Sequence, residues 1–164
     1  MGLFDFIKDA GEKVFGKDED PKEAAAELAA AQAKKAAVEA RRVQTLTEYV
    51  GRLGFEIDDL GIAVDGDVVV VSGTVATQDV KEKIVLALGN TAGTARVDDR
   101  ITVEVEEPEA SFHTVVSGDS LSKIAKKYYG DPMKYTVIFE ANKPMLSDPD
   151  KIYPGQVLRI PPVA

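Results

Sequence analysis

The stretch that decides the fold runs from Phe112 to Pro161 and reads FHTVVSGDSLSKIAKKYYGDPMKYTVIFEANKPMLSDPDKIYPGQVLRIP. Its two ends, residues 112–116 and 156–160, are rich in apolar and β-branched residues and predict strands. Between them, two segments have apolar residues at helical spacing. These residues are Leu121, Ile124, Ala125 and Tyr128 in the first segment, and Tyr135, Ile138 and Phe139 in the second. The pattern predicts a strand–helix–helix–strand unit.

Each boundary within this unit has its own turn or capping signal. The turn at 117–120 offers Asp119 or Ser120 as the cap of the first helix. Gly130 ends that helix, the following Asp-Pro pair starts the next, and Pro-Gly at 154–155 turns the chain into the last strand. Through V-x-S-G-D-S-L-x-x-I-A, I-F-E-A-N and I-Y-P-G-Q-V-L-R-I-P, the unit resembles the LysM domain.

Length and composition limit the kind of protein. The chain has 164 residues, enough for one ordinary domain or two small ones, and its 45% hydrophobic and 29% charged residues are typical of a globular protein. A net charge of −8 argues against nucleic acid as a partner, because phosphate binding needs clustered basic residues. There is no cysteine and no long apolar run that would predict a membrane span.

The N-terminal part contains two segments outside any predicted domain. Residues 1–17 predict an amphipathic helix whose acidic residues, Asp5 and Asp9, argue against an export signal and against stable membrane insertion. We therefore expect a cytoplasmic protein. Residues 18–42 are rich in alanine and predict a solvated helical spacer, or an extension of the helix that follows.

Residues 43–106 have the pattern of a second small domain. An amphipathic helix from Val43, two strands joined by Asp65-Gly66-Asp67, a helix capped by Thr77 and a final strand give the order α-β-β-α-β. The motifs V-V-V-S-G-T-V-x-T-Q-D-V-K-E-K-I and G-x-A-R-V-D-D-R-I resemble a BON domain. With an acidic linker at 107–111 and the LysM unit at 112–164, the chain is predicted to be an α+β protein of two small domains.

Residues typical of enzyme active sites are scarce. His113 is the only histidine, and without cysteine neither a Cys–His dyad nor a histidine-rich metal cluster can form. The neighbouring carboxylates at 58–59 and 98–99 are explained more simply by turns and strand ends. We therefore expect no catalytic residues and no enzyme activity.

The loop G-N-T-A-G-T at 89–94 has two possible interpretations. It can be the cap and connection that follow a helix, which also require Gly and Asn. It can also be a cation site, because carbonyl oxygens at a helix C-terminus lack intrahelical partners and carry partial negative charge. The loop contains no carboxylate, which favours a weakly hydrated monovalent ion over calcium or magnesium.

The whole chain resembles the bacterial potassium-binding protein family. The resemblance rests on M-G-L-F-x-F-x-K-D-A-G-E-K at the start, followed by the BON and then the LysM motifs. It implies a protein that senses K⁺, becomes more compact on binding it, and holds it in a cage of main-chain carbonyls. The residues implied for that cage are Ile7, Ala10, Gly11, Gly89, Thr91 and Thr94.

A different function stays open for the LysM unit. Resemblance to LysM domains implies a groove for N-acetylglucosamine polymers, such as peptidoglycan or chitin, between two loops. Its candidate residues are Gly118, Asp119, Ser120 and Leu121, with Ile152, Tyr153 and Pro154. A role as a cell-envelope adaptor with an unidentified protein partner is the other alternative, and in each case we expect a monomer.

Overall fold

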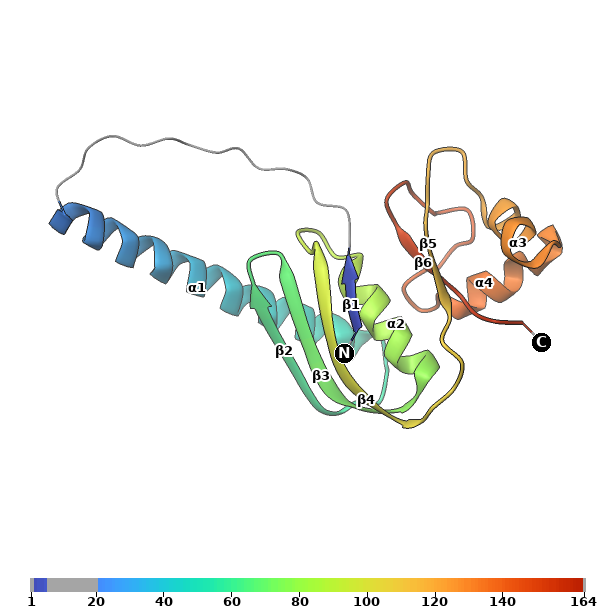
Figure 1. The fold of residues 1–164 in the computed structure, drawn as a ribbon, viewed down its shortest axis with the longest axis horizontal. Coiled ribbons are helices and arrows are strands. Elements are labelled where there is room, and N and C mark those ends of the chain that lie inside the picture. The colour runs from blue at the N-terminus through green and yellow to red at the C-terminus, as the bar shows by residue number, and fades with distance from the viewer. Residues whose placement is uncertain (1, 6–20, 164) are drawn as a thin grey trace.

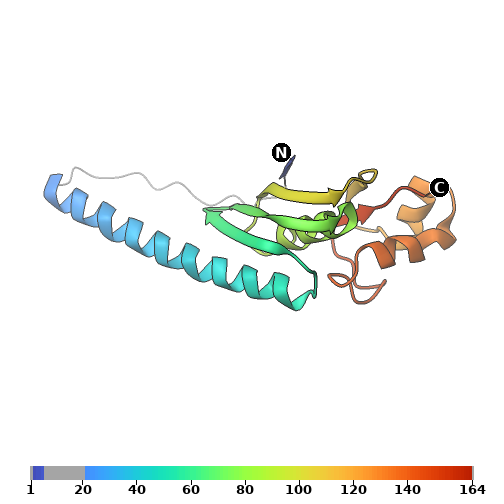
Figure 2. The same ribbon diagram turned by 90° about the horizontal axis from the view of Figure 1, so that it is seen from below.

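A computed structural model of the chain describes residues 2–5 and 21–163. The molecule is elongated, with a long helix at one end, a mixed domain in the middle and the LysM unit at the other end (Figures 1 and 2). The strands and helices of the first part are β1 (Gly2–Asp5), α1 (Pro21–Arg52), β2 (Asp58–Asp65), β3 (Val68–Thr77), α2 (Gln78–Gly89) and β4 (Arg96–Val105). From α1 onward their order is α-β-β-α-β, as the sequence predicts.

The four strands form one sheet in the order β1-β4-β3-β2. The hairpin between β2 and β3 turns at Gly66, which has a φ of 60°, and so matches the predicted Asp-Gly-Asp signal. Strands β3 and β4 are parallel and are connected by α2, while β1 pairs antiparallel with the free edge of β4. In that pairing Asp5 lies opposite Arg96, the first residue of β4.

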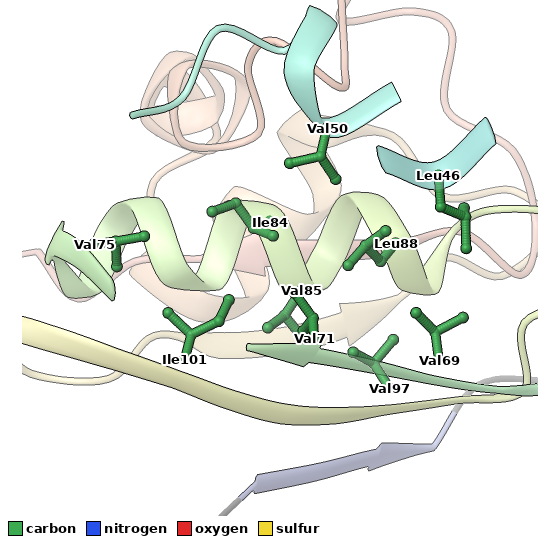
Figure 3. Packing of buried hydrophobic residues seen from close by; sticks show 10 residues of the cluster. All are labelled: Leu46, Val50, Val69, Val71, Val75, Ile84, Val85, Leu88, Val97 and Ile101. Carbon is green, nitrogen blue, oxygen red and sulfur yellow. The ribbon is translucent and has the colours of Figure 1, made fainter. Parts of the chain in front are cut away.

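One face of this sheet carries the core. Figure 3 shows the side chains of the sheet pointing toward α2, with Leu46 and Val50 pointing down from the C-terminal half of α1. The buried cluster comprises Leu46, Val50, Val69, Val71, Val75, Ile84, Val85, Leu88, Val97 and Ile101. Thr77 caps α2 by accepting the backbone N–H of Val80, as predicted.

The LysM unit consists of β5 (Ser111–Thr114), α3 (Leu121–Tyr129), a short 3₁₀ turn (Pro132–Lys134), α4 (Tyr135–Ala141) and β6 (Val157–Ile160). Strands β5 and β6 pair antiparallel. Ser120 caps α3, Gly130 ends it in the left-handed conformation, and Asp131 caps the next turn, as the sequence predicts. The apolar residues of both helices pack against β6 in a separate core.

Two features of the N-terminal part differ from the sequence pattern. Gly2–Asp5 is a strand where the pattern predicts the first turn of a helix, because the unpaired edge of β4 offers backbone partners that helical periodicity does not reveal. Helix α1 continues without a break through residues 42 and 43, so the alanine-rich segment extends the helix of the domain. Every described side chain from Lys22 to Val38 is exposed.

Candidate functional site

The candidate cation loop lies between α2 and β4. Of the residues proposed for it, Gly89, Thr91 and Thr94 are described, whereas Ile7, Ala10 and Gly11 lie outside the described residues. Gly89 is the buried last residue of α2. Gly93 has a φ of 79°, which only glycine adopts readily, and this conformation lets the chain turn from the helix into β4.

The main chain of this loop is partly hydrogen-bonded to itself. The N–H of Thr91 donates to the carbonyl of Leu88 at 3.2 Å, and the N–H of Thr94 donates to the carbonyl of Thr91 at 3.2 Å. Within the part of the chain that the structure describes, no hydrogen bond reaches the carbonyls of Gly89 or Thr94. The carbonyls of Leu88 and Thr91, by contrast, each accept a hydrogen bond from within the loop.

A chain of hydrogen bonds fixes the threonine hydroxyls. Arg42 Nη2 donates to Thr94 Oγ1 at 2.6 Å, the two threonine hydroxyls lie 2.8 Å apart, and Thr91 Oγ1 donates to the Leu88 carbonyl at 2.6 Å. Because the only proton of the Thr91 hydroxyl goes to Leu88, Thr94 must donate to Thr91. Each hydroxyl therefore donates one hydrogen bond and accepts another.

Arg42 also determines the electrostatics of the loop. Its Nη1 donates to the carbonyl of Gly66 at 2.8 Å, so one guanidinium joins the β2–β3 turn to the loop after α2. Among the described residues, no group of three His, Cys, Asp or Glu side chains is placed to hold a metal. A fixed positive charge repels a divalent ion twice as strongly as a monovalent one, so Arg42 disfavours a divalent ion at this loop more than a monovalent one.

The same loop holds the LysM unit, which the sequence did not predict. The side-chain amide of Asn90 donates to the carbonyl of Val157 at 2.8 Å and accepts the N–H of Val157 at 2.8 Å. Asn142 makes the same pair of bonds to Arg159, at 2.9 and 2.7 Å. The edge of β6 that faces away from β5 is thus covered by two asparagines, one from each domain.

A buried ionic cluster forms the second contact between the domains. Arg159 of β6 points into α2, where its Nε bonds to Glu82 and its Nη1 lies 2.7 Å from Asp79. Glu82 also accepts the N–H of Ala110, at 2.9 Å, so the linker ends on the same carboxylate. The sequence signal for this contact is an arginine between the apolar residues of a predicted strand. It does not identify the carboxylates to which the arginine binds.

The two candidate sugar loops of the LysM unit lie side by side. Backbone bonds from Val115 to Gln156 and from Gly155 to Val115, both 2.8 Å, join the loop after β5 to the loop before β6. Most of the candidate residues have structural roles: Leu121 is buried, Ile152 packs on the core, and Ser120 caps α3. Such roles explain these residues without a sugar.

Asp119 and Gly118 likewise bond within the protein. Asp119 bonds to Nε2 of the buried His113 at 2.9 Å and accepts the N–H of Val116, and the carbonyl of Gly118 accepts from Lys123. The hydrogen bond with His113 lowers the pKa of Asp119 below its ordinary value.

Tyr153 and Pro154 are candidate sugar residues that lie on the surface: Tyr153 is 48% exposed and the neighbouring Pro154 is also exposed. Its loop faces the end of α1. There burial raises the pKa of the Tyr49 phenol, and the nearby Tyr153 adds to that increase. An exposed aromatic ring beside two adjoining loops offers a flat apolar surface on which a sugar ring can pack.

Comparison with known proteins covers both domains. The BON domain family model matches residues 40–105, and the LysM domain model matches residues 113–161. Both are families of binding domains. Among the described residues, no helix is long and apolar enough to cross a membrane.

Several relatives share part or all of the sequence. The chain is similar to the potassium binding protein Kbp of Escherichia coli O6:H1, at 43% identity over 98% of this chain and 99% of that protein. An uncharacterized protein of Deinococcus radiodurans is 54% identical over 34% of this chain and 21% of its own. An esterase of Mycobacterium tuberculosis is 43% identical over 32% of this chain and 11% of its own.

Proposed function

The chain belongs to the family of the potassium binding protein Kbp, and from this membership we propose that it binds one K⁺ ion through main-chain carbonyls. The proposed ligands are the carbonyls of Gly89, Thr91 and Thr94, completed by those of Ile7, Ala10 and Gly11. The protein acts as a monomeric cytoplasmic binding protein and not as an enzyme. Ion binding orders the N-terminal segment on the BON domain, and this ordering is the sensing step.

The register of β1 is the observation that supports this proposal most. Because β1 runs antiparallel to β4, Asp5 lies beside Arg96, two residues after Thr94. Ile7 follows Asp5 by two residues, a distance of about 7 Å of extended chain at most. Strand β1 thus ends beside the start of β4, close in sequence to the loop 89–94, and this supports the proposal that the N-terminal candidates complete the site.

The chemistry of the loop favours potassium among the common cations. Its available oxygens are uncharged carbonyls, which can replace the weakly held water of K⁺ more easily than that of Mg²⁺. The buried C-terminal end of α2 adds the partial negative charge of the helix dipole. The positive charge of Arg42, which bonds to Thr94, repels a divalent ion more strongly than it repels K⁺.

A calorimetric titration of ion-stripped protein with KCl tests the proposal, with NaCl at equal ionic strength as the matched titrant. We expect a saturable heat with K⁺ and a higher melting temperature in K⁺ than in Na⁺, because a ligand that binds only the folded state stabilises it. Absence of heat with KCl, together with equal melting temperatures in the two salts, would contradict potassium binding.

A second function, glycan binding by the LysM unit, is favoured by the exposed Tyr153 beside the two adjoining loops. We expect retention on insoluble peptidoglycan or chitin that the substitution Tyr153→Ala weakens. Since Tyr153 is exposed, the variant should keep its fold, which a melting curve would check. Equal recovery of both proteins in the unbound fraction would argue against a sugar ligand.

A further inference from the structure

Asn90 occupies a position between the two halves of the molecule. In sequence it lies between the candidate ligands Gly89 and Thr91, and its backbone N–H donates to the carbonyl of Leu86 at 3.0 Å. Its side chain leaves the loop and bonds to both backbone groups of Val157 in the LysM unit. The main chain of Asn90 thus belongs to the ion loop, while its side chain binds the LysM unit.

We propose that Asn90 is a positioning residue that couples K⁺ binding to attachment of the LysM domain, an inference that rests on the proposed function. An ion held by the carbonyls before and after Asn90 fixes the backbone that aims its amide at β6. Two simultaneous hydrogen bonds need a narrow range of amide orientations, so a mobile loop would lose them first. The side chain itself contributes no oxygen to the ion.

Coupling of this kind is reciprocal. If bound K⁺ strengthens the contact between Asn90 and Val157, then that contact must strengthen K⁺ binding by the same factor. Removal of the Asn90 side chain should therefore weaken K⁺ binding, although its amide points away from the ion loop. A residue with a purely local role as a helix cap would not link the affinity to the distant strand.

Asn142 provides a matched control. It makes the same two bonds to β6, but to Arg159 and from within the LysM unit. The variants Asn90→Ala and Asn142→Ala each remove one amide from the same strand edge. We expect the first to weaken K⁺ binding about tenfold, as loss of one net hydrogen bond would. The second should stay within about twofold of the wild type.

Amide hydrogen exchange provides a readout that a merely structural role would not change. In wild-type protein, K⁺ should slow the exchange of the Val157 N–H, which Asn90 holds. The Arg159 N–H, held by Asn142, is the control in the same molecule and should change much less. In Asn90→Ala, the Val157 N–H should exchange quickly with and without K⁺.

The outcomes separate the two proposals. No K⁺ binding by wild-type protein would end the proposed function and the coupling with it. K⁺ binding that is equal in the wild type and Asn90→Ala, or equally weakened in both variants, would overturn only the coupling. Should Asn90→Ala fail to fold, the wild-type measurement still decides: equal effects of K⁺ on the Val157 and Arg159 amides would refute the inference.

Discussion

The buried ionic contact of Arg159 gives the most quantitative prediction. The side chain of Arg159 is 7% exposed and that of Glu82 is 4% exposed, so the pair is removed from water. We consider Arg159→Met, which keeps an unbranched apolar stem in place and removes the guanidinium. Glu82 would then keep its bonds from Gln78 and Ala110 but lose its only positively charged partner in this contact.

Removing one member of a buried ion pair leaves the other charge without compensation. The typical loss is about 3–5 kcal/mol. Because Glu82 keeps two hydrogen-bond donors, we expect the lower end, about 3 kcal/mol. The second carboxylate partner of Arg159, Asp79, adds little to this loss of stability. Its side chain is 38% exposed, so water can replace the arginine.

Urea unfolding at constant K⁺ would measure the loss, and a double-mutant cycle would assign it. Glu82→Gln removes the charge but keeps the shape of the side chain. The double variant Arg159→Met with Glu82→Gln should recover most of the loss, because no uncompensated charge remains. We expect a coupling energy of about 2–3 kcal/mol between the two sites.

A loss below about 1 kcal/mol for Arg159→Met, which is the range of exposed ion pairs, would contradict a strongly stabilising buried pair. Strictly additive losses in the double variant would refute it equally, because the two residues would then act independently. In addition, exchange of the Ala110 N–H should be faster in Glu82→Gln, since an amide oxygen is a weaker acceptor than a carboxylate.

Three other predictions follow from single contacts. Arg42→Met should lower the free energy of unfolding by about 1–2 kcal/mol, because hydrogen bonds of the guanidinium are lost. It should also reduce the preference for K⁺ over Mg²⁺ in calorimetry, because a positive charge that repels the divalent ion more strongly is removed. Arg42→Lys, which keeps the charge, should preserve that preference. The lowered pKa of Asp119, caused by its bond to His113, means that its stabilisation is complete above pH 3.8 and disappears as the pH falls toward the lowered value. Asp119→Asn should therefore destabilise the protein at neutral pH and progressively less as the pH falls below 3.8 in urea unfolding, and a loss that does not change with pH would contradict a stabilising bond from His113 to the ionised carboxylate. Gly73→Ala should cost about 1–3 kcal/mol, because φ is +146° and the new Cβ would lie 3.0 Å from the carbonyl of Asp58; thermal unfolding unchanged from wild type would contradict this.

The order of strands and helices could be predicted because its signals are local. The caps Thr77 and Ser120 and the left-handed Gly130 each act within a few residues of their position, and the structure has all three. The strand at Gly2–Asp5 could not be predicted in this way. It forms because β4 has an unpaired edge, and its partner lies more than ninety residues away in the sequence.

The candidate site was predictable only in part. The glycines and the absence of carboxylates identify the loop 89–94 as a possible cation site, but they fit a plain helix cap as well. The contact of Arg42 with Thr94, and that of Asn90 with Val157, join residues 52 and 67 positions apart. A local pattern cannot show such pairs, because each residue alone resembles an ordinary surface residue.

The projecting half of α1 has a practical consequence for the potassium experiments. Its turns up to Val38 have exposed side chains and are continuous with a packed helix, which supplies the nucleus. Alanine propensity sustains them, together with the contact of Lys35 with Asp65 at 3.0 Å. Heating should fray them gradually from Pro21 inward, without cooperativity. Far-ultraviolet circular dichroism would then show a sloping native baseline unrelated to the ion. The chain has five tyrosines and no tryptophan, so near-ultraviolet tyrosine signals would follow the cooperative unfolding of the two domains more faithfully.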